Sequence, residues 1–198
     1  MPVNGSVPDV AEKRKNWNGL ISGFRASDLV FLDESGCNTD MTRRYAYSLG
    51  GSRAVDSAPL SKPKNTTILS SIQLDGTLHC TTFSGGTTVA HFKQYLKEDL
   101  LPHLNGDSVL VMDNMKSHHA KAVRNLLDSS GVRYIYLPPY SPDLNPIEKL
   151  WSKVKSFLRK FKARTLDALP NAIQCAFQTV SPSDCSGWFH SCGYSPYF

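Results

Sequence analysis

Short apolar segments bounded by turn residues recur along this chain and predict a series of strands. Six segments have this character: 29–32, 44–49, 66–74, 77–83, 108–112 and 132–137. The third and fourth are separated by Asp75 and Gly76, a strong hairpin signal, so we expect them to pair antiparallel. Two of the most apolar segments, 29–32 and 108–112, are each followed at once by an aspartate.

Apolar residues at helical spacing predict helices in the remaining segments: 89–104, 121–127, 146–161 and about 166–179. Early hairpin strands followed by alternating helices and strands indicate a mixed α/β sheet. This is the order of a ribonuclease H-like domain, in which three meandering strands precede two strands joined by right-handed crossovers. We therefore predict a mixed five-stranded sheet flanked by helices.

The predicted elements suggest one domain with short flanking segments. Residues 1–27 read as a short helix or lead-in, 28–165 as the ribonuclease H-like catalytic domain, and 166–198 as a C-terminal helix and tail packed on that domain. A length of 198 residues suits a single core, and 40% hydrophobic with 20% charged residues is typical of a soluble globular protein.

No apolar run approaches the roughly 18 residues that cross a bilayer, and residues 1–16 lack the apolar centre of a signal peptide. We therefore expect a cytoplasmic protein without membrane association. The five cysteines are scattered and form no C-x-x-C pair, which favours reduced, structural thiols.

Basic residues concentrate in the predicted helix at 146–161 and its exit. The chain carries 22 Lys and Arg against 17 Asp and Glu, a net charge of +5. The clustered residues are Lys149, Lys153, Lys155, Arg159, Lys160, Lys162 and Arg164. A solvated helix face is the ordinary explanation, but no acid occurs between Glu148 and Asp167 to form i,i+4 pairs. We predict that Lys149, Lys153, Arg159 and Lys160 contact DNA phosphates.

Asp33 and Asp113 each follow a predicted buried strand. If those strands are parallel neighbours, the two carboxylates lie side by side and repel each other unless a cation lies between them. Oxygen-only ligands favour Mg²⁺ or Mn²⁺. The alternative is a pair of unrelated aspartates in turns.

Glu148 follows a segment with four prolines in nine residues, Pro138, Pro139, Pro142 and Pro146. Asn145 and Glu148 could form a capping box at the helix start, which is a purely local explanation. So many fixed φ angles, however, would hold the helix start where an active site needs its third acid. Asp143 is an alternative third acid.

Three acidic motifs of the sequence resemble those of a known family. LPPYSPDLNPIEKLW at 137–151, FLDES at 31–35 and VMDN at 111–114 are similar to the acidic motifs of bacterial insertion-sequence transposases related to the mariner superfamily. Thirty-four residues separate Asp113 from Glu148, which is typical of this branch. The match covers about residues 8–165. It implies a ribonuclease H-like fold in which Asp33, Asp113 and Glu148 are the catalytic, metal-binding acids.

The resemblance implies a two-metal mechanism with Mg²⁺, for which Mn²⁺ can substitute. Water first cleaves a phosphodiester at the transposon end, and the freed 3′-hydroxyl then attacks target DNA, at TA dinucleotides in this family. We expect double-stranded DNA as the partner, a homodimer on DNA, and a bacterial protein associated with the nucleoid. Only about 28 residues precede the first acidic strand, so the helix-turn-helix modules that recognise transposon ends are expected to be missing or separate, through truncation or a split reading frame.

Several further residues are candidates for DNA contact. Lys116 and His118, with Asn114 and His119, follow the second acid and could touch phosphate or metal-bound water. Arg43, Arg44 and Arg53 either line the DNA path or decorate a solvated hairpin. Two rival functions stay open: a ribonuclease H-like nuclease without strand transfer, and a domesticated DNA-binding protein that no longer cleaves.

Overall fold

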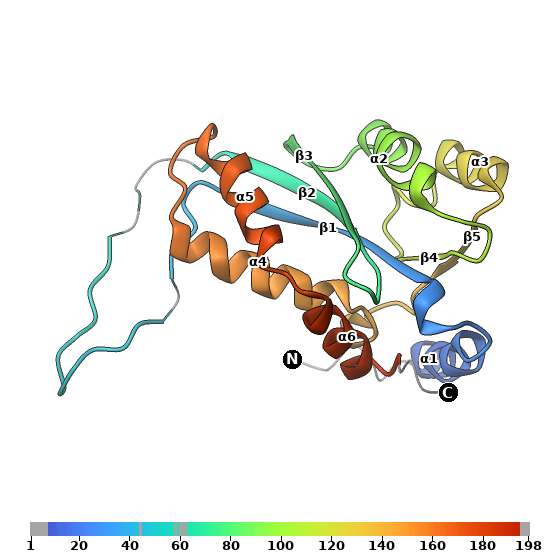
Figure 1. Cartoon of the computed structure of the whole chain (residues 1–198), viewed down its shortest axis with the longest axis horizontal. Helices are drawn as coiled ribbons and strands as arrows, with labels where there is room; N and C mark the ends of the chain where they lie inside the picture. The colour runs from blue at the N-terminus through green and yellow to red at the C-terminus, as the bar shows by residue number, and fades with distance from the viewer. Residues whose placement is uncertain (1–7, 44, 58, 60–62, 195–198) are drawn as a thin grey trace.

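The computed structural model describes residues 8–43, 45–57, 59 and 63–194 and contains one mixed sheet (Figure 1). Its five strands lie in the order β3-β2-β1-β4-β5. Their bounds are Leu29–Asn38 for β1, Asn65–Ile72 for β2, Leu78–Ser84 for β3, Val109–Met112 for β4 and Arg133–Tyr136 for β5. β1, β2 and β3 form an antiparallel meander, whereas β4 and β5 continue from β1 in parallel. The predicted mixed five-stranded sheet is confirmed.

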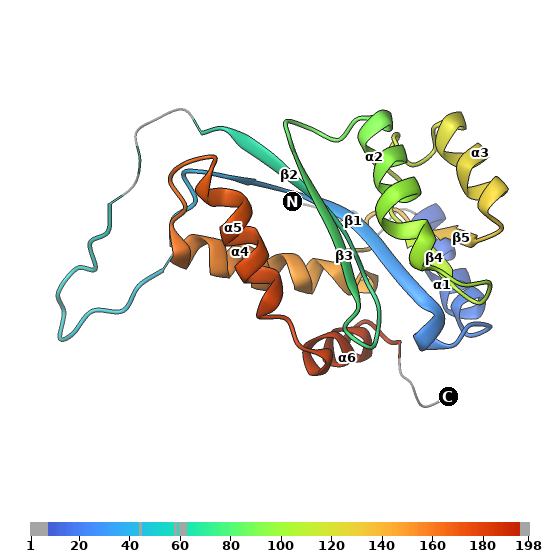
Figure 2. The ribbon, with the colours of Figure 1, turned by 45° about the horizontal axis from the view of Figure 1, so that its top comes forward.

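Helices cover both faces of the sheet (Figures 1 and 2). On one face, α2 (Val89–Tyr95), η3 (Leu96–Leu100) and α3 (Lys121–Ser130) pack against alternate strand residues such as Val30 and Leu32. On the other, α4 (Ile147–Phe161), α5 (Ala168–Gln178) and α6 (Pro182–Ser191) pack against Leu29 and Phe31. Successive strand residues point to opposite faces, so β1 and β4 contribute to two separate cores.

The first helix, α1 (Pro8–Ile21), joins the α4 side of the sheet through the buried side chain of Trp17. Trp17 Nε1 donates to the Tyr194 hydroxyl over 3.1 Å. That hydroxyl in turn donates to the Leu144 carbonyl over 2.6 Å. The two ends of the described chain are thereby fastened to the loop that precedes α4.

Two expectations about the elements were wrong. The segment 44–49 is not a strand in residues 45–49, and Arg44 lies outside the described residues. Tyr45, Tyr47 and Leu49 are almost fully exposed, because residues 45–57 leave the sheet and project from the rest of the molecule (Figures 1 and 2). Part of the expected tail is helical: Pro182–Ser191 form α6, whose start has a complete capping box between Ser181 and Asp184.

The strand that carries Asp33 is longer than predicted. The sequence suggests a turn after Leu32, but β1 continues to Asn38 because it pairs with β2 along residues 31–38. Asp33 therefore lies inside a strand rather than at its end. In the part of the chain that the structure describes, no helix is long and apolar enough to cross a membrane.

Candidate active site

The register between β1 and β4 brings Asp33 and Asp113 together. Leu32 is paired with Met112 in the parallel ladder, and β4 ends there while β1 continues. Asp33, the next residue of β1, therefore lies beside Asp113, the first residue after β4. The parallel neighbouring arrangement expected for these strands is confirmed.

Asp33 is buried on the α4 side of the sheet, with 7% of its surface exposed. Its Oδ1 accepts a hydrogen bond from the Glu34 backbone N–H (2.8 Å), and its Oδ2 accepts one from Trp151 Nε1 (3.1 Å). Burial, reinforced by the negative charges of Asp113 and Glu148, outweighs these bonds and raises the pKa of Asp33 to about 7. Ionisation of Asp33 beside Asp113 and Glu148 is thus disfavoured unless a cation accompanies it.

The His118 ring contacts the carboxylate of Asp113. His118 Nδ1 lies 2.8 Å from Asp113 Oδ1, and its Nε2 lies 3.1 Å from Glu34 Oε2. Burial lowers the pKa of His118, but its hydrogen bonds to Asp113 and Glu34 prevail and raise it to about 9. Burial alone would raise the pKa of Asp113, yet hydrogen bonds from His118 and the Met115 N–H hold it below its ordinary value. The sequence pattern did not reveal this Glu34–His118–Asp113 network.

Glu148 stands in the first turn of α4, and its side chain is exposed. The capping-box alternative is not observed, because no side chain caps α4 and the buried Asn145 Oδ1 has no hydrogen-bond partner. The loop before the helix is constrained: Tyr140 adopts a φ of 55°, a left-handed conformation that is rare for a residue with a side chain. Asp143 turns away toward α1, where Arg14 binds both of its oxygens (3.0 and 2.5 Å).

The three acids line one open cleft of about 560 Å³. Asp33 comes from β1, Asp113 follows the end of β4 and Glu148 comes from α4; the segment Leu137–Pro142 also lines the cleft. Across the described residues, no three His, Cys, Asp or Glu side chains are already arranged as a metal site. The acids therefore share a cleft but do not converge on one point.

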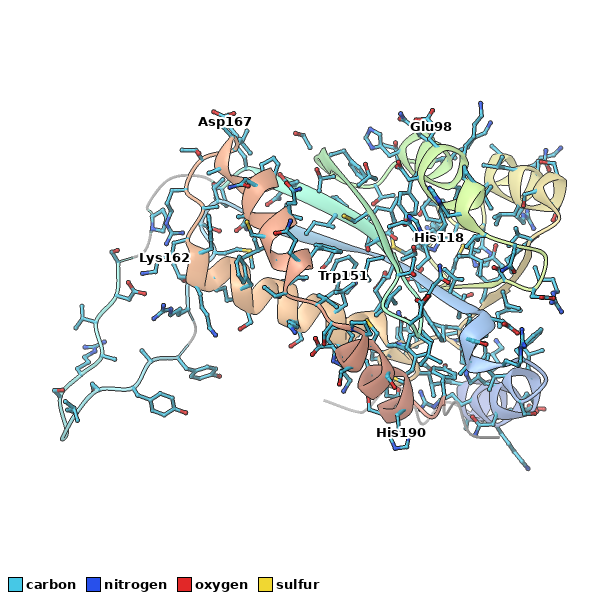
Figure 3. All side chains as sticks on the ribbon, in the orientation of Figure 1. Glu98, His118, Trp151, Lys162, Asp167 and His190 are labelled. Carbon is cyan, nitrogen blue, oxygen red and sulfur yellow. The ribbon has the colours of Figure 1, made fainter. Side chains whose placement is uncertain are left out.

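The predicted DNA-contact residues differ in their surroundings. His118 is fully buried beneath the sheet edge, so its assignment as a DNA contact was wrong; its ring stacks on Phe92 (Figure 3). Lys116 is exposed and follows Met115, which lines the cleft. Lys149, Lys153 and Lys160 line a groove between α4 and α6, although Lys153 Nζ already pairs with Asp184 at 2.6 Å. Arg159 is half-buried.

Part of the basic cluster serves the fold instead. Arg164 donates to the carbonyls of Thr39 and Met41, and Lys162 pairs with Asp56. These contacts fasten the segment between β1 and β2 to the end of α4. Arg43 and Arg53 are exposed on that segment.

Comparison with known proteins places this architecture in a family. The family model described as DDE superfamily endonuclease matches residues 28–170, most of the chain. The chain belongs to the DDE superfamily of endonucleases. The Transposable element Tc1 transposase of Caenorhabditis elegans is 29% identical to this chain over 92 residues. That match covers 46% of the chain and 34% of the Tc1 protein, so the chain spans about a third of this relative's length.

Solved structures share the fold of this chain. The Mos1 transposase paired-end complex with left transposon end superposes with a TM-score of 0.79 at 21% identity, over 94% of this chain and 60% of that chain. The catalytic domain of Mos1 mariner transposase gives a TM-score of 0.69 at 16% identity, over 92% and 87%. The predicted ribonuclease H-like fold is thus confirmed.

Proposed function

We propose that this chain is the catalytic domain of a DNA transposase that cleaves transposon ends and joins them to target DNA. One observation carries the proposal: Asp33, Asp113 and Glu148, from three separate elements, line a single cleft in a member of the DDE endonuclease superfamily. The bacterial insertion-sequence branch is part of the same proposal and rests on the LPPYSPDLNPIE segment.

The three carboxylates fit a divalent cation. They offer only oxygen donors, which Mg²⁺ and Mn²⁺ prefer. Burial, reinforced by the negative charges of Asp113 and Glu148, raises the pKa of Asp33, and a nearby cation would favour its ionised form. Mos1 structures have been described with Mg and with Mn. We propose that Asp33, Asp113 and Glu148 hold two Mg²⁺ ions, for which Mn²⁺ substitutes. Such ions supply Lewis-acid activation of the attacking oxygen and charge stabilisation at the leaving oxygen.

The residues of the chain itself position the reacting groups. Trp151 and the Glu34 N–H orient Asp33, and the Met115 N–H donates to Asp113. The proline-rich loop sets where α4 begins and thereby the position of Glu148 in its first turn. No protein nucleophile is required, because water opens the phosphodiester and the resulting 3′-hydroxyl attacks the target strand. Positioning and charge neutralisation account for the rate.

DNA would reach the cleft along a basic path. Lys116 lies beside the acids, and Lys149, Lys153, Arg159 and Lys160 lie on α4, whose first turn carries Glu148. We propose that these side chains neutralise phosphates of transposon ends and of target DNA with TA dinucleotides. His118 is buried and is not part of this proposal. A homodimer on paired ends and a separate helix-turn-helix module for end recognition complete the proposal, with the protein acting in the bacterial cytoplasm at the nucleoid.

A strand-transfer assay with pre-cleaved ends tests the function directly. Labelled duplexes ending in a free 3′-hydroxyl are mixed with a target plasmid and Mg²⁺, and joined products are resolved on a gel. A transposase gives joined products that disappear in Asp113→Asn, while DNA binding by the variant persists. A nuclease would degrade substrate without joining, and a non-cleaving DNA-binding protein would shift the duplex without any product; either result would refute the proposal.

A further inference from the structure

We propose that His118 is a positioning residue that fixes the carboxylate of Asp113 for metal binding, with Glu34 as its anchor. This inference rests on the proposed function, since it concerns one of the three acids assigned there to the metal ions. It gives a role to the buried histidine and glutamate that the cleavage chemistry leaves unused.

The His118 ring bridges two acids. Nδ1 lies 2.8 Å from Asp113 Oδ1 and 3.3 Å from the Asp113 carbonyl oxygen, and Nε2 lies 3.1 Å from Glu34 Oε2. Each ring nitrogen therefore has a carboxylate oxygen within hydrogen-bonding distance, so the ring links Asp113 to Glu34.

The ring has little freedom to turn. It is fully buried, and it stacks on Phe92 with 4.2 Å between ring centroids and 26° between planes. Its backbone is fixed as well, because the His118 N–H donates to the Met115 carbonyl and the His118 carbonyl accepts from the Tyr136 hydroxyl. The nitrogen that faces Asp113 therefore has a defined position.

Asp113 depends on such support more than Asp33 does. Asp33 belongs to a strand that is paired with β2, and Trp151 holds its side chain. Asp113 instead follows the last residue of β4. Its Oδ1 faces two donors, the Met115 N–H at 2.9 Å and His118 Nδ1 at 2.8 Å. Because both donors approach the same oxygen, they orient the carboxylate and leave Oδ2 to face a cation.

The alternation of β1 gives its two consecutive acids different tasks. Asp33 lies on the α4 side with Trp151, whereas Glu34 lies on the opposite side with His118. β1 thus supplies one acid to the cleft directly. Through Glu34 and His118 it also braces the acid that comes from β4.

Two isosteric variants separate the two hydrogen bonds of the ring. The amide nitrogen of His118→Asn is expected to replace Nδ1 and keep a donor for Asp113. The amide nitrogen of His118→Gln is expected to replace Nε2 and keep only the bond to Glu34. Mn²⁺ alone is titrated into each purified protein, and unbound Mn²⁺ is followed by electron paramagnetic resonance. Thermal unfolding is recorded in parallel.

We expect His118→Gln to weaken Mn²⁺ binding about 10- to 100-fold, as for other residues that orient metal ligands, and His118→Asn to weaken it only a few-fold. Leu127→Ala, in the same core but away from the ring, controls for lost stability and should bind Mn²⁺ like the wild type. Equal Mn²⁺ affinities for the two His118 variants, or losses that follow melting temperature across all three, would overturn the inference. If the wild type itself binds no Mn²⁺, the proposed metal site fails instead.

Discussion

Trp151 Nε1 donates a hydrogen bond to Asp33 Oδ2 across 3.1 Å, linking the first turns of α4 to the middle of β1. Glu148 precedes Trp151 by three residues on the same helix, so the bond also fixes how close the turn that carries Glu148 lies to Asp33. A side chain that belongs to the apolar face of α4 thus takes part in arranging the acidic cleft.

Replacement of Trp151 by phenylalanine should disturb both stability and metal affinity. The variant keeps most of the buried ring but leaves Asp33 without its side-chain donor, which should cost about 1–2 kcal/mol of unfolding free energy. Because the lost bond favours the ionised carboxylate, the pKa of Asp33 should rise further and Mn²⁺ binding at pH 7 should weaken. Urea unfolding and Mn²⁺ titration measure the two effects. Trp188→Phe, on α6, is the matched control and should leave Mn²⁺ affinity unchanged.

The raised pKa of Asp33 predicts how the metal-free protein responds to pH. Since the folded-state pKa is about 7 and the unfolded value is about 4, folding favours the protonated carboxyl. Its stabilising contribution is complete below pH 4 and is lost as the pH rises through 7, a change on the order of 4 kcal/mol. Asp33→Asn should abolish that part of the dependence, so that in EDTA the variant gains stability over the wild type from pH 5 to pH 8. Parallel pH profiles for the two proteins would contradict this.

Neutralising Glu148 and Asp143 in separate variants tests which of the two is the third acid of the site. Glu148→Gln should reduce metal-dependent cleavage more than roughly a hundredfold, because it removes a direct ligand. Asp143→Asn should cleave almost normally, since Asp143 is paired with Arg14 outside the cleft. Cleavage of a labelled transposon end is the measurement. The reverse order of effects would assign the third position to Asp143.

The salt dependence of DNA binding tests whether the lysines of the groove on α4 contact phosphates. Lys149→Gln combined with Lys160→Gln should lower the slope of log Kd against log salt concentration by about 2, one for each phosphate contact removed. Lys97→Gln, exposed on the opposite side of the sheet, should leave the slope unchanged. Fluorescence anisotropy with duplex DNA at several salt concentrations measures the slopes. An unaltered slope in the double variant would indicate that these lysines form only a solvated helix face.

The prediction of the sheet succeeded where the signals are local. The Asp75-Gly76 turn separates β2 from β3, and the apolar runs 29–32 and 108–112 mark the beginning of β1 and the whole of β4. It failed where pairing partners decide the outcome. β1 continues through polar residues because β2 lies beside it, whereas residues 45–49 have the composition of a strand but no neighbouring strand.

Single residues show the same division. His118 is polar and follows an acidic motif, which suggests exposure, yet the fold encloses it between Phe92, Glu34 and Asp113. Lys162 and Arg164 belong to the basic cluster, but they bind the segment between β1 and β2. Contacts between residues far apart along the chain cannot be read from the neighbours of either one.

Turn chemistry, periodicity and spacing act over a few residues, so the sequence was sufficient to predict most of the elements, the three candidate acids and the proline-rich approach to Glu148. The side chains that hold those acids in place depend on contacts between distant parts of the chain. The parallel register sets Asp113 beside Asp33, and burial brings Trp151 and His118 to their carboxylates. Those relationships arise from packing between β1, β4 and α4, which are separated by many residues in the chain and meet only when the two faces of the sheet are covered.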